Sequence, residues 1–213
     1  MKNPGINKEI EELFSRWKRR NIAGSFCENK FEALEMIKES VPEAVSVGVS
    51  GSQTLDQLGV IAMLEAAGRK VFNQNKPGIS RQESLELRRL GAGADYYLAS
   101  ANAIARTGEL VFLSAYGNRT AGVANARNVV IVCGVNKLSD DLPAALSRAR
   151  EYATPLNCKR LDWKSACLEN GHCREVKCFA PEYRRMCAQL LIIESEVAAD
   201  RLKVILVNES LGF

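Results

Sequence analysis

Helical and extended segments alternate through the first half of the chain, and this alternation restricts the fold more than any other sequence feature. Ser80 and Glu83 have the spacing of a capping box, which marks a helix start. Apolar residues at helical spacing predict helices over 7–20, 30–40, 53–68 and 80–95. Short β-branched runs predict strands at 22–27, 44–51 and 69–73. The pattern indicates an open, mostly parallel α/β sheet with helices on both faces.

Strands dominate the centre of the chain. Extended patterns cover residues 96–105, 107–117 and 128–138, and a helix is predicted over Leu142–Tyr152 before a final strand that starts at Leu202. A chain of 213 residues can bury a substantial core as one domain. We therefore expect a single α/β domain over residues 1–213, with a cysteine-rich insertion or lobe at about 157–188.

Charge and hydropathy exclude several classes of partner. The net charge is only +4, and the charges are interleaved, which argues against a nucleic-acid-binding protein. No apolar run approaches the roughly 18 residues that a membrane span needs, and the polar start does not resemble a signal peptide. We therefore expect a cytoplasmic protein, in a compartment where cysteines stay reduced.

Five of the seven cysteines are concentrated between Cys158 and Cys187. Glycine, proline and many charged residues interrupt this segment, so it buries little apolar surface and needs a cross-link to become ordered. A metal ion, an iron–sulfur cluster, disulfides and free thiols are the alternatives, and a reducing compartment favours metal. We expect four thiols to converge on either a [4Fe-4S] cluster or zinc, with Cys158 left over. The expected ligands are Cys167, Cys173, Cys178 and Cys187.

The turn after the predicted strand at 44–51 is the first candidate ligand site. Gly51 allows a close backbone approach, and Ser50, Ser52 and Thr54 add hydroxyl groups at the start of the next helix. Ligands of open α/β sheets bind beyond the carboxyl ends of the strands, and backbone N–H groups at a helix start favour anions. An anionic small molecule is therefore expected here, although a capped strand-to-helix turn would look the same.

Two further segments add candidate residues. Asn102 lies among small residues that permit close approach. Thr107 and Gly108 form a turn that we expect to line the same ligand site, beside the turn at 50–54, and Glu109 follows them. Glu109 is the candidate catalytic residue, as a general base or a nucleophile, and the alternative is an exposed hairpin residue. A flexible loop is predicted to carry two further polar candidates for this site. These are Asn118 and Arg119.

Three motifs resemble the LUD domain, the lactate utilization protein C family. They are the Gly-Ser-x-Thr turn at 51–54, Asp95 with Ala-Ile-Ala-x-Thr-Gly at 103–108, and Val-x-Lys at 135–137. The last nine residues, 205–213, resemble the tail of a short subgroup that also has a cysteine segment. The spacing in that segment is Cys-x5-Cys-x2-Cys-x6-Cys, whereas the gaps here are five, four and eight residues. The resemblance covers the chain from about Lys8 to Phe213.

The resemblance implies a three-layer Rossmann-like sandwich, similar to the sugar-phosphate isomerase and CoA-transferase fold. It also implies a role in the oxidation of L-lactate alongside iron–sulfur partner subunits. The association with such partners favours an iron–sulfur cluster over zinc at the four cysteines.

Three functional hypotheses follow. The first is an accessory or redox subunit of lactate-type oxidation that binds an anion at residues 50–54. The second is a transferase or ligase that acts on a phosphate- or CoA-bearing substrate with Glu109 catalytic. The third is a zinc-holding regulatory or interaction module. The sequence leaves open whether the protein is itself an enzyme, and what its oligomeric state is.

Overall fold

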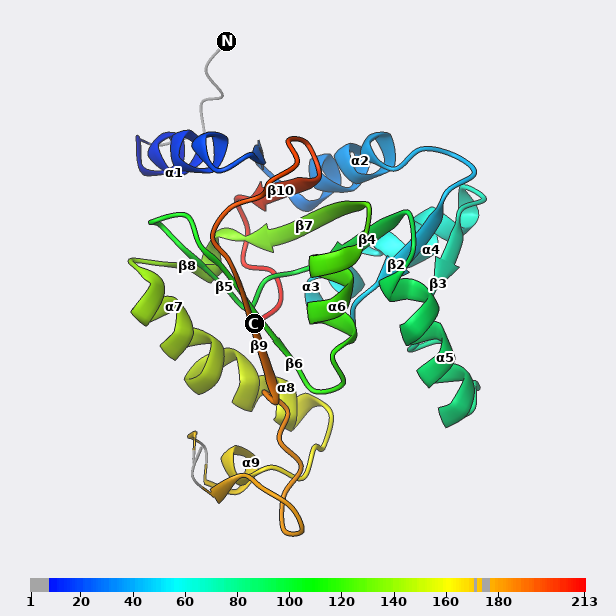
Figure 1. Ribbon diagram of the computed structural model, residues 1–213, viewed down its shortest axis with the longest axis vertical. Helices are drawn as coiled ribbons and strands as arrows, with labels where there is room; N and C mark the ends of the chain where they lie inside the picture. The colour runs from blue at the N-terminus through cyan, green and yellow to red at the C-terminus, as the bar shows by residue number, and fades with distance from the viewer. Residues whose placement is uncertain (1–7, 171, 174–176) are drawn as a thin grey trace.

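A six-stranded parallel sheet forms the centre of the computed structural model, which describes residues 8–170, 172–173 and 177–213 (Figure 1). Each neighbouring pair of strands is parallel. In spatial order the strands are β1 (Ile22–Cys27), β10 (Leu202–Val207), β7 (Asn128–Gly134), β4 (Tyr96–Ala99), β2 (Ser46–Val49) and β3 (Lys70–Phe72). The predicted α/β class with a mostly parallel sheet is confirmed.

Helices cover both faces of this sheet because alternate strand residues point to opposite sides. On one face, Val129 and Ile131 of β7 pack with buried residues of α1 (Lys8–Arg19) and α6 (Asn118–Asn125). On the other face, Val130 and Val132 pack with three further helices. These are α2 (Lys30–Ser40), α3 (Gln53–Leu58) and α4 (Val60–Ala66). Strands buried on both faces explain the nearly continuous apolar run of β7.

A second, four-stranded sheet lies against the first core. Its order is β8 (Leu138–Ser139), β5 (Ala103–Ala105), β6 (Leu110–Ser114) and β9 (Gln189–Ile193). Small residues of β5 face Ala145 of α7 (Leu142–Ser147) and Ala149 of η2 (Arg148–Ala153), while Phe112 on the opposite face joins the main core. The sequence did not predict β9, which directly follows the cysteine segment.

Three predicted boundaries are wrong, each for a local reason. The helix predicted over 53–68 breaks into α3 and α4 at Gly59, whose φ is 69°. The extended segment 96–105 divides between the two sheets as β4 and β5. The loop predicted for Asn118 and Arg119 is the first turn of α6, because Gly122 lets this helix pack on Tyr97. A Cβ at Gly122 would lie 2.3 Å from the Tyr97 ring.

Helix α5 (Arg81–Ala92) packs against β2, β3 and α6, and its predicted capping box is present. A continuous helical run from α7 through η2 to α8 (Thr154–Arg160) crosses to the cysteine lobe. Pro155 lacks the N–H that would close a regular turn, and the preceding segment widens to a π-helix. There the Thr154 hydroxyl donates to the carbonyl of Ala149 at 2.8 Å. The widened turn thus places Thr154 in the lining of a pocket at the strand ends.

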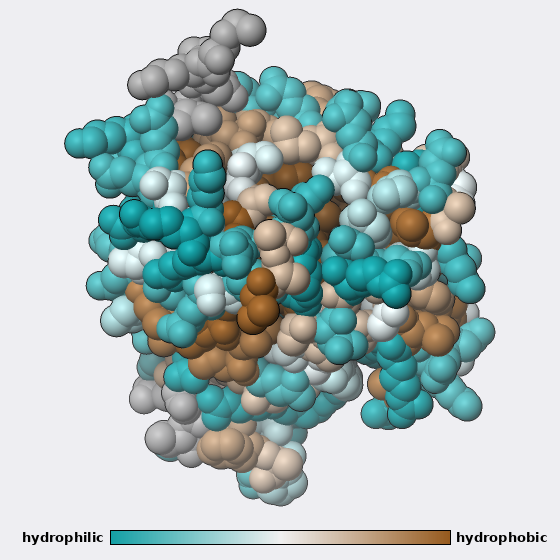
Figure 2. Space-filling model, turned by 45° about the horizontal axis from the view of Figure 1, so that its top comes forward, coloured by the Kyte–Doolittle hydropathy of each residue, from teal (hydrophilic) through white to brown (hydrophobic). Residues whose placement is uncertain are grey.

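The cysteine lobe contains the short helix α9 (Ala166–Asn170) and lies beyond α8, at the bottom of Figure 1. Cys27 and Cys133 are buried in strands of the main sheet, and burial raises the pKa of Cys27 to about 11. Hydrophilic residues cover most of the face drawn in Figure 2. In the part of the chain that the structure describes, no helix is long and apolar enough to cross a membrane.

Candidate functional site

A pocket lies at the carboxyl ends of the parallel strands, where β2 and β4 are neighbours. Strand β2 leads to β3 on one side, and β4 leads to β7 on the other, so the chain leaves the two strand ends in opposite directions. Such a switch point is where open α/β sheets bind ligands. The main pocket has a volume of about 600 Å³ and adjoins an inner cavity of about 40 Å³.

Most of the predicted ligand-binding residues line these two spaces. Gly51, Asn102 and Arg119 line both. Asn118 lines only the main pocket, and Ser52 and Thr54 line only the inner cavity. Ser50 is buried beside them, lines neither space, and its Oγ has no hydrogen-bond partner among the described residues.

Lys137 is the central charged group of the inner cavity. It lies in η1 (Val135–Lys137), directly after β7, and only 4% of its surface is exposed. Its ammonium group donates to the hydroxyls of Thr54 at 3.1 Å and Ser100 at 2.8 Å, and to the carbonyl of Ala101 at 3.1 Å. Burial lowers its pKa to about 8 because the interior disfavours the charged form. Lys137 thus connects the ends of β2, β4 and β7.

Arg119 forms part of the floor between the pocket and the inner cavity. Its guanidinium donates to the side chain of Asn102 at 3.0 Å and to the carbonyls of Leu113 and Gly51. Its Nε is buried and has no hydrogen-bond partner among the described residues. Burial lowers the pKa of Arg119, but an arginine remains charged in proteins. The side chain therefore places a fixed positive charge at the strand ends.

The C-terminal segment closes the inner cavity. Gly212 has a φ of 64°, and a Cβ there would lie 2.5 Å from the Thr54 hydroxyl, so only glycine fits this close approach. Arg148 of η2 donates to the carbonyls of Asn102, Asn136 and Phe213 and so fixes this segment against β5. The tail motif is thus part of the wall of the site.

Positive side chains outnumber carboxylates in the lining of the main pocket. Arg88 of α5 and Arg160 of α8 line it together with Arg119, and Asp56 is the one acidic side chain among its lining residues in the described chain. Tyr116 and Trp163 add aromatic walls, with their rings edge to face at 5.9 Å. The pocket is therefore suited to an anion.

Thr107, Gly108 and Glu109 do not line this pocket, which corrects their predicted position beside the Ser50–Thr54 turn. They form the turn between β5 and β6, whereas the pocket lies at the other end of this hairpin, where Asn102 and Ser114 are found. Ser114 comes five positions after Glu109, a distance of about 17 Å along an extended chain. The antiparallel pairing of β5 and β6 thus separates the two segments.

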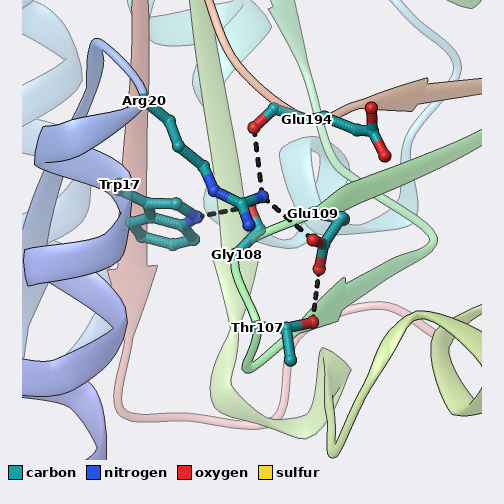
Figure 3. Close-up of polar contacts among 6 residues, drawn as sticks. All are labelled: Trp17, Arg20, Thr107, Gly108, Glu109 and Glu194. Carbon is teal, nitrogen blue, oxygen red and sulfur yellow. Dashed lines mark hydrogen bonds and ion pairs between the residues drawn. The ribbon is translucent and has the colours of Figure 1, made fainter.

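Figure 3 shows what Glu109 contacts instead. It accepts a hydrogen bond from Thr107 and pairs with Arg20 at 3.0 Å, and Arg20 also donates to the carbonyl of Glu194. The indole of Trp17 donates to the carbonyl of Gly108 at 2.9 Å. Burial raises the pKa of Glu109, but the hydrogen bonds outweigh it, and the net pKa is lowered. A carboxylate held in its charged form by an arginine is typical of a structural ion pair.

The four cysteines predicted as ligands lie around one small cavity of about 10 Å³, together with Ser165, Arg150 and Arg185. Cys158 does not line it, and burial raises the pKa of that thiol to about 12. Among the described residues, no three Cys, His, Asp or Glu side chains are placed so that they could hold one metal ion. The donors are gathered but not arranged as a coordination sphere.

The LUD domain profile matches residues 10–207. The chain belongs to the LUD domain family. This family is associated with lactate utilization. No functionally curated protein matches the sequence.

Three solved structures are similar to this LUD protein. A DUF162 family protein from Deinococcus radiodurans superposes with a TM-score of 0.54 at 14% identity, over 94% of this chain and 96% of that one. A ribose 5-phosphate isomerase from Plasmodium falciparum superposes with a TM-score of 0.35 at 17% identity, over 52% of each chain. One from Methanocaldococcus jannaschii gives 0.36 at 16% identity, over 53% of this chain and 55% of that one. The first match shows the shared fold.

Of the cations in the LUD site, the sequence alone identified only Arg119. Lys137 was visible only as the last residue of the Val-x-Lys motif. Arg88 and Arg148 lie on predicted helices, and Arg160 lies within the cysteine segment. A lysine directly after a buried strand was the available signal, because strand ends are where ligands bind.

Proposed function

We propose that this LUD protein binds a small organic anion in the pocket and acts as an accessory or redox subunit in lactate-type oxidation. One observation carries the proposal. Lys137 is buried at the strand ends and, among the described residues, forms no ion pair with a carboxylate side chain. A buried charge is costly unless an opposite charge accompanies it.

An anion in the inner cavity would supply that opposite charge. The hydroxyls of Ser52 and Thr54 line the cavity beside Lys137, and Arg119 adds a second cation on its floor. A carboxylate placed there would be held by charge and oriented by the Ser52 hydroxyl, because the Thr54 hydroxyl donates to the carbonyl of Leu211. Oxidation of a 2-hydroxy acid to a 2-oxo acid releases two electrons and two protons, and we assign the electron acceptor to an iron–sulfur partner subunit.

Binding of L-lactate and pyruvate, measured by calorimetry, tests this function. Both carboxylates should bind saturably, whereas lactamide, the neutral amide of the same size, should not. Lys137→Met should weaken binding at least tenfold, and Lys159→Met, an exposed change on α8, should leave it unchanged. Equal binding of lactate and lactamide would contradict the proposal.

A metal in the cysteine lobe is a second, separate proposal. Cys167, Cys173, Cys178 and Cys187 surround one cavity, which Arg150 and Arg185 also line. A space of about 10 Å³ is of the size of a single ion such as zinc, but the thiols would have to turn toward the ion to bind it, and a [4Fe-4S] cluster would require them to move outward. Either group would supply the cross-link that a charged, weakly apolar lobe otherwise lacks.

Metal analysis of protein prepared without oxygen tests the lobe. We expect about one equivalent of zinc, or a cluster with absorbance near ~400 nm. The double variant Cys167→Ser/Cys187→Ser should bind neither, and Cys27→Ser should bind as the parent does, because Cys27 is in the core. If the parent protein contains no more than trace amounts of zinc and of iron, the metal site is excluded.

A further inference from the structure

The main pocket is much larger than a three-carbon acid. Its volume of about 600 Å³ is within the roughly 300–1,000 Å³ that pockets for larger organic ligands occupy. The inner cavity of about 40 Å³ is only a few times the ~10–15 Å³ that one water molecule needs, which is room for a carboxylate group. Lactate would fill the inner cavity and leave most of the main pocket empty.

The cations of the site fall into two groups that match these two spaces. Lys137 lines only the inner cavity, and Arg119 lies where the spaces meet. Arg88 and Arg160 line the main pocket and not the inner cavity, and they come from different elements, α5 and α8. A single small anion in the inner cavity would be in contact with the first group only. In the main pocket, Asp56 interacts electrostatically with Arg160, so one carboxylate accompanies the two arginines of the second group.

Arg88 and Arg160 are placed to bind an anion in the outer part. The guanidinium of Arg88 lies 4.6 Å from the centre of the Tyr116 ring, which holds its plane, and within the described chain Arg88 forms no ion pair. Two N–H groups of Arg160 donate to the side chain of Asn157 at 3.2 and 3.0 Å, which orients its remaining donors. Planar guanidinium groups match the oxygen geometry of phosphate.

Resting on the proposed function, we propose that the ligand of this pocket carries two separated anionic groups. A carboxylate occupies the inner cavity near Lys137, and a phosphate occupies the outer part at Arg88 and Arg160. The substrate class is a phosphorylated organic acid whose two charged ends are joined by a chain of several atoms. Arg88 and Arg160 are then the residues that distinguish it from unphosphorylated acids.

Three matched probes test the two-anion proposal by calorimetry at pH 7. 6-Phosphogluconate carries both groups, gluconate lacks the phosphate, and glucose 6-phosphate lacks the carboxylate. We expect 6-phosphogluconate to bind at least tenfold more tightly than either of the others. The double variant Arg88→Ala/Arg160→Ala should weaken the binding of 6-phosphogluconate at least tenfold and change the affinity for gluconate less than twofold. Lys137→Met should weaken the binding of gluconate at least tenfold.

The control is Arg89→Ala/Lys159→Ala, which removes two exposed neighbours outside the main pocket and should leave all three affinities unchanged. Equal affinities for gluconate and 6-phosphogluconate would overturn the two-anion proposal and leave the proposed function standing. Loss of gluconate binding in the double arginine variant would overturn the division into two subsites. Absence of saturable binding by any probe, together with absence of lactate binding, would overturn both proposals.

Discussion

At the scale of single residues, Lys137 has the most consequential environment. Four strand ends meet around it: those of β2, β4 and β7, and the tail after β10 that brings Gly212 close. Its three donors have neutral acceptors, so these contacts hold the ammonium without neutralising it. The residue is therefore fixed in place, and its charge is free to act on a ligand.

Anion binding should depend on pH through this lysine. Burial lowers the pKa of Lys137 to about 8, so the ammonium is charged below that pH and loses its proton above it. The dissociation constant of gluconate, which does not titrate in this range, should be constant from pH 6 to 7.5 and rise by up to about tenfold per pH unit above 8. Calorimetry between pH 6 and 9.5 checks this. A flat profile would show that the charge of Lys137 does not contribute.

Without ligand, the stability of the protein should change with pH in the opposite direction to ligand affinity, because folding is linked to the protonation of Lys137. The folded-state pKa of Lys137 lies below its ordinary value of 10.5, so the unfolded chain binds the proton more strongly. The contribution of Lys137 to stability should therefore be least below pH 8 and increase between about 8 and 10.5. Lys137→Met should remove this increase in a series of urea unfolding curves.

Glu109→Gln should affect stability rather than ligand binding. The change weakens the partly buried pair with Arg20, and we expect a loss of about 1 kcal/mol, or roughly 2–4 °C in Tm for a chain of this size. Gluconate affinity should stay within twofold, because Glu109 lies at the far end of its hairpin from the pocket. If an activity is found that the Gln variant lacks entirely, the catalytic hypothesis for Glu109 would be restored.

At the scale of elements, close packing at one glycine fixes helix α6 and with it Arg119. Gly122 faces the ring of Tyr97 on β4, and a methyl group there would overlap the ring. The Tyr97 hydroxyl also donates to the carbonyl of Asn118 at 2.9 Å, so the first turn of α6 is bound to the same side chain. The position of α6 therefore depends on Tyr97, which does not line the pocket.

Gly122→Ala should destabilise the protein by about 1–3 kcal/mol, because a clash in a packed interface forces backbone shifts. Urea unfolding measures this change. The matched control is Gly93→Ala, where φ is −104° and the nearest atom to a new Cβ is 3.9 Å away, so stability should change by less than about 0.5 kcal/mol. Equal effects of the two substitutions would contradict the packing argument.

At the scale of the whole molecule, the cysteine lobe and the ligand pocket have a common wall. Thr154 and Met186 line both the main pocket and the thiol cavity, and Trp163 of the pocket donates to the carbonyl of Arg184 at 2.6 Å. A group that orders the lobe should therefore also order one side of the pocket. The lobe would act on the site through packing rather than through chemistry.

Removal of metal from the lobe should accordingly weaken anion binding several-fold, since a coupling between two sites acts in both directions. The comparison is gluconate affinity with and without a chelator, under anaerobic conditions. In Cys167→Ser/Cys187→Ser the chelator should have no effect, and affinity should match that of the chelated parent protein. An unchanged affinity in the chelated parent would show that the shared wall does not couple the two sites.

The sequence by itself determined the α/β class, most of the helices and strands, and the capping box at Ser80, and it predicted a ligand site at the turn 50–54. These features depend on local periodicity and on the rule that strand ends bind ligands. Only the tertiary structure decided which turns lie together. Strand order brought Lys137 to Thr54, and the pairing of β5 with β6 carried Glu109 away. Contacts between residues far apart in the chain leave no local pattern, so a buried lysine and a surface lysine look alike until the fold places them.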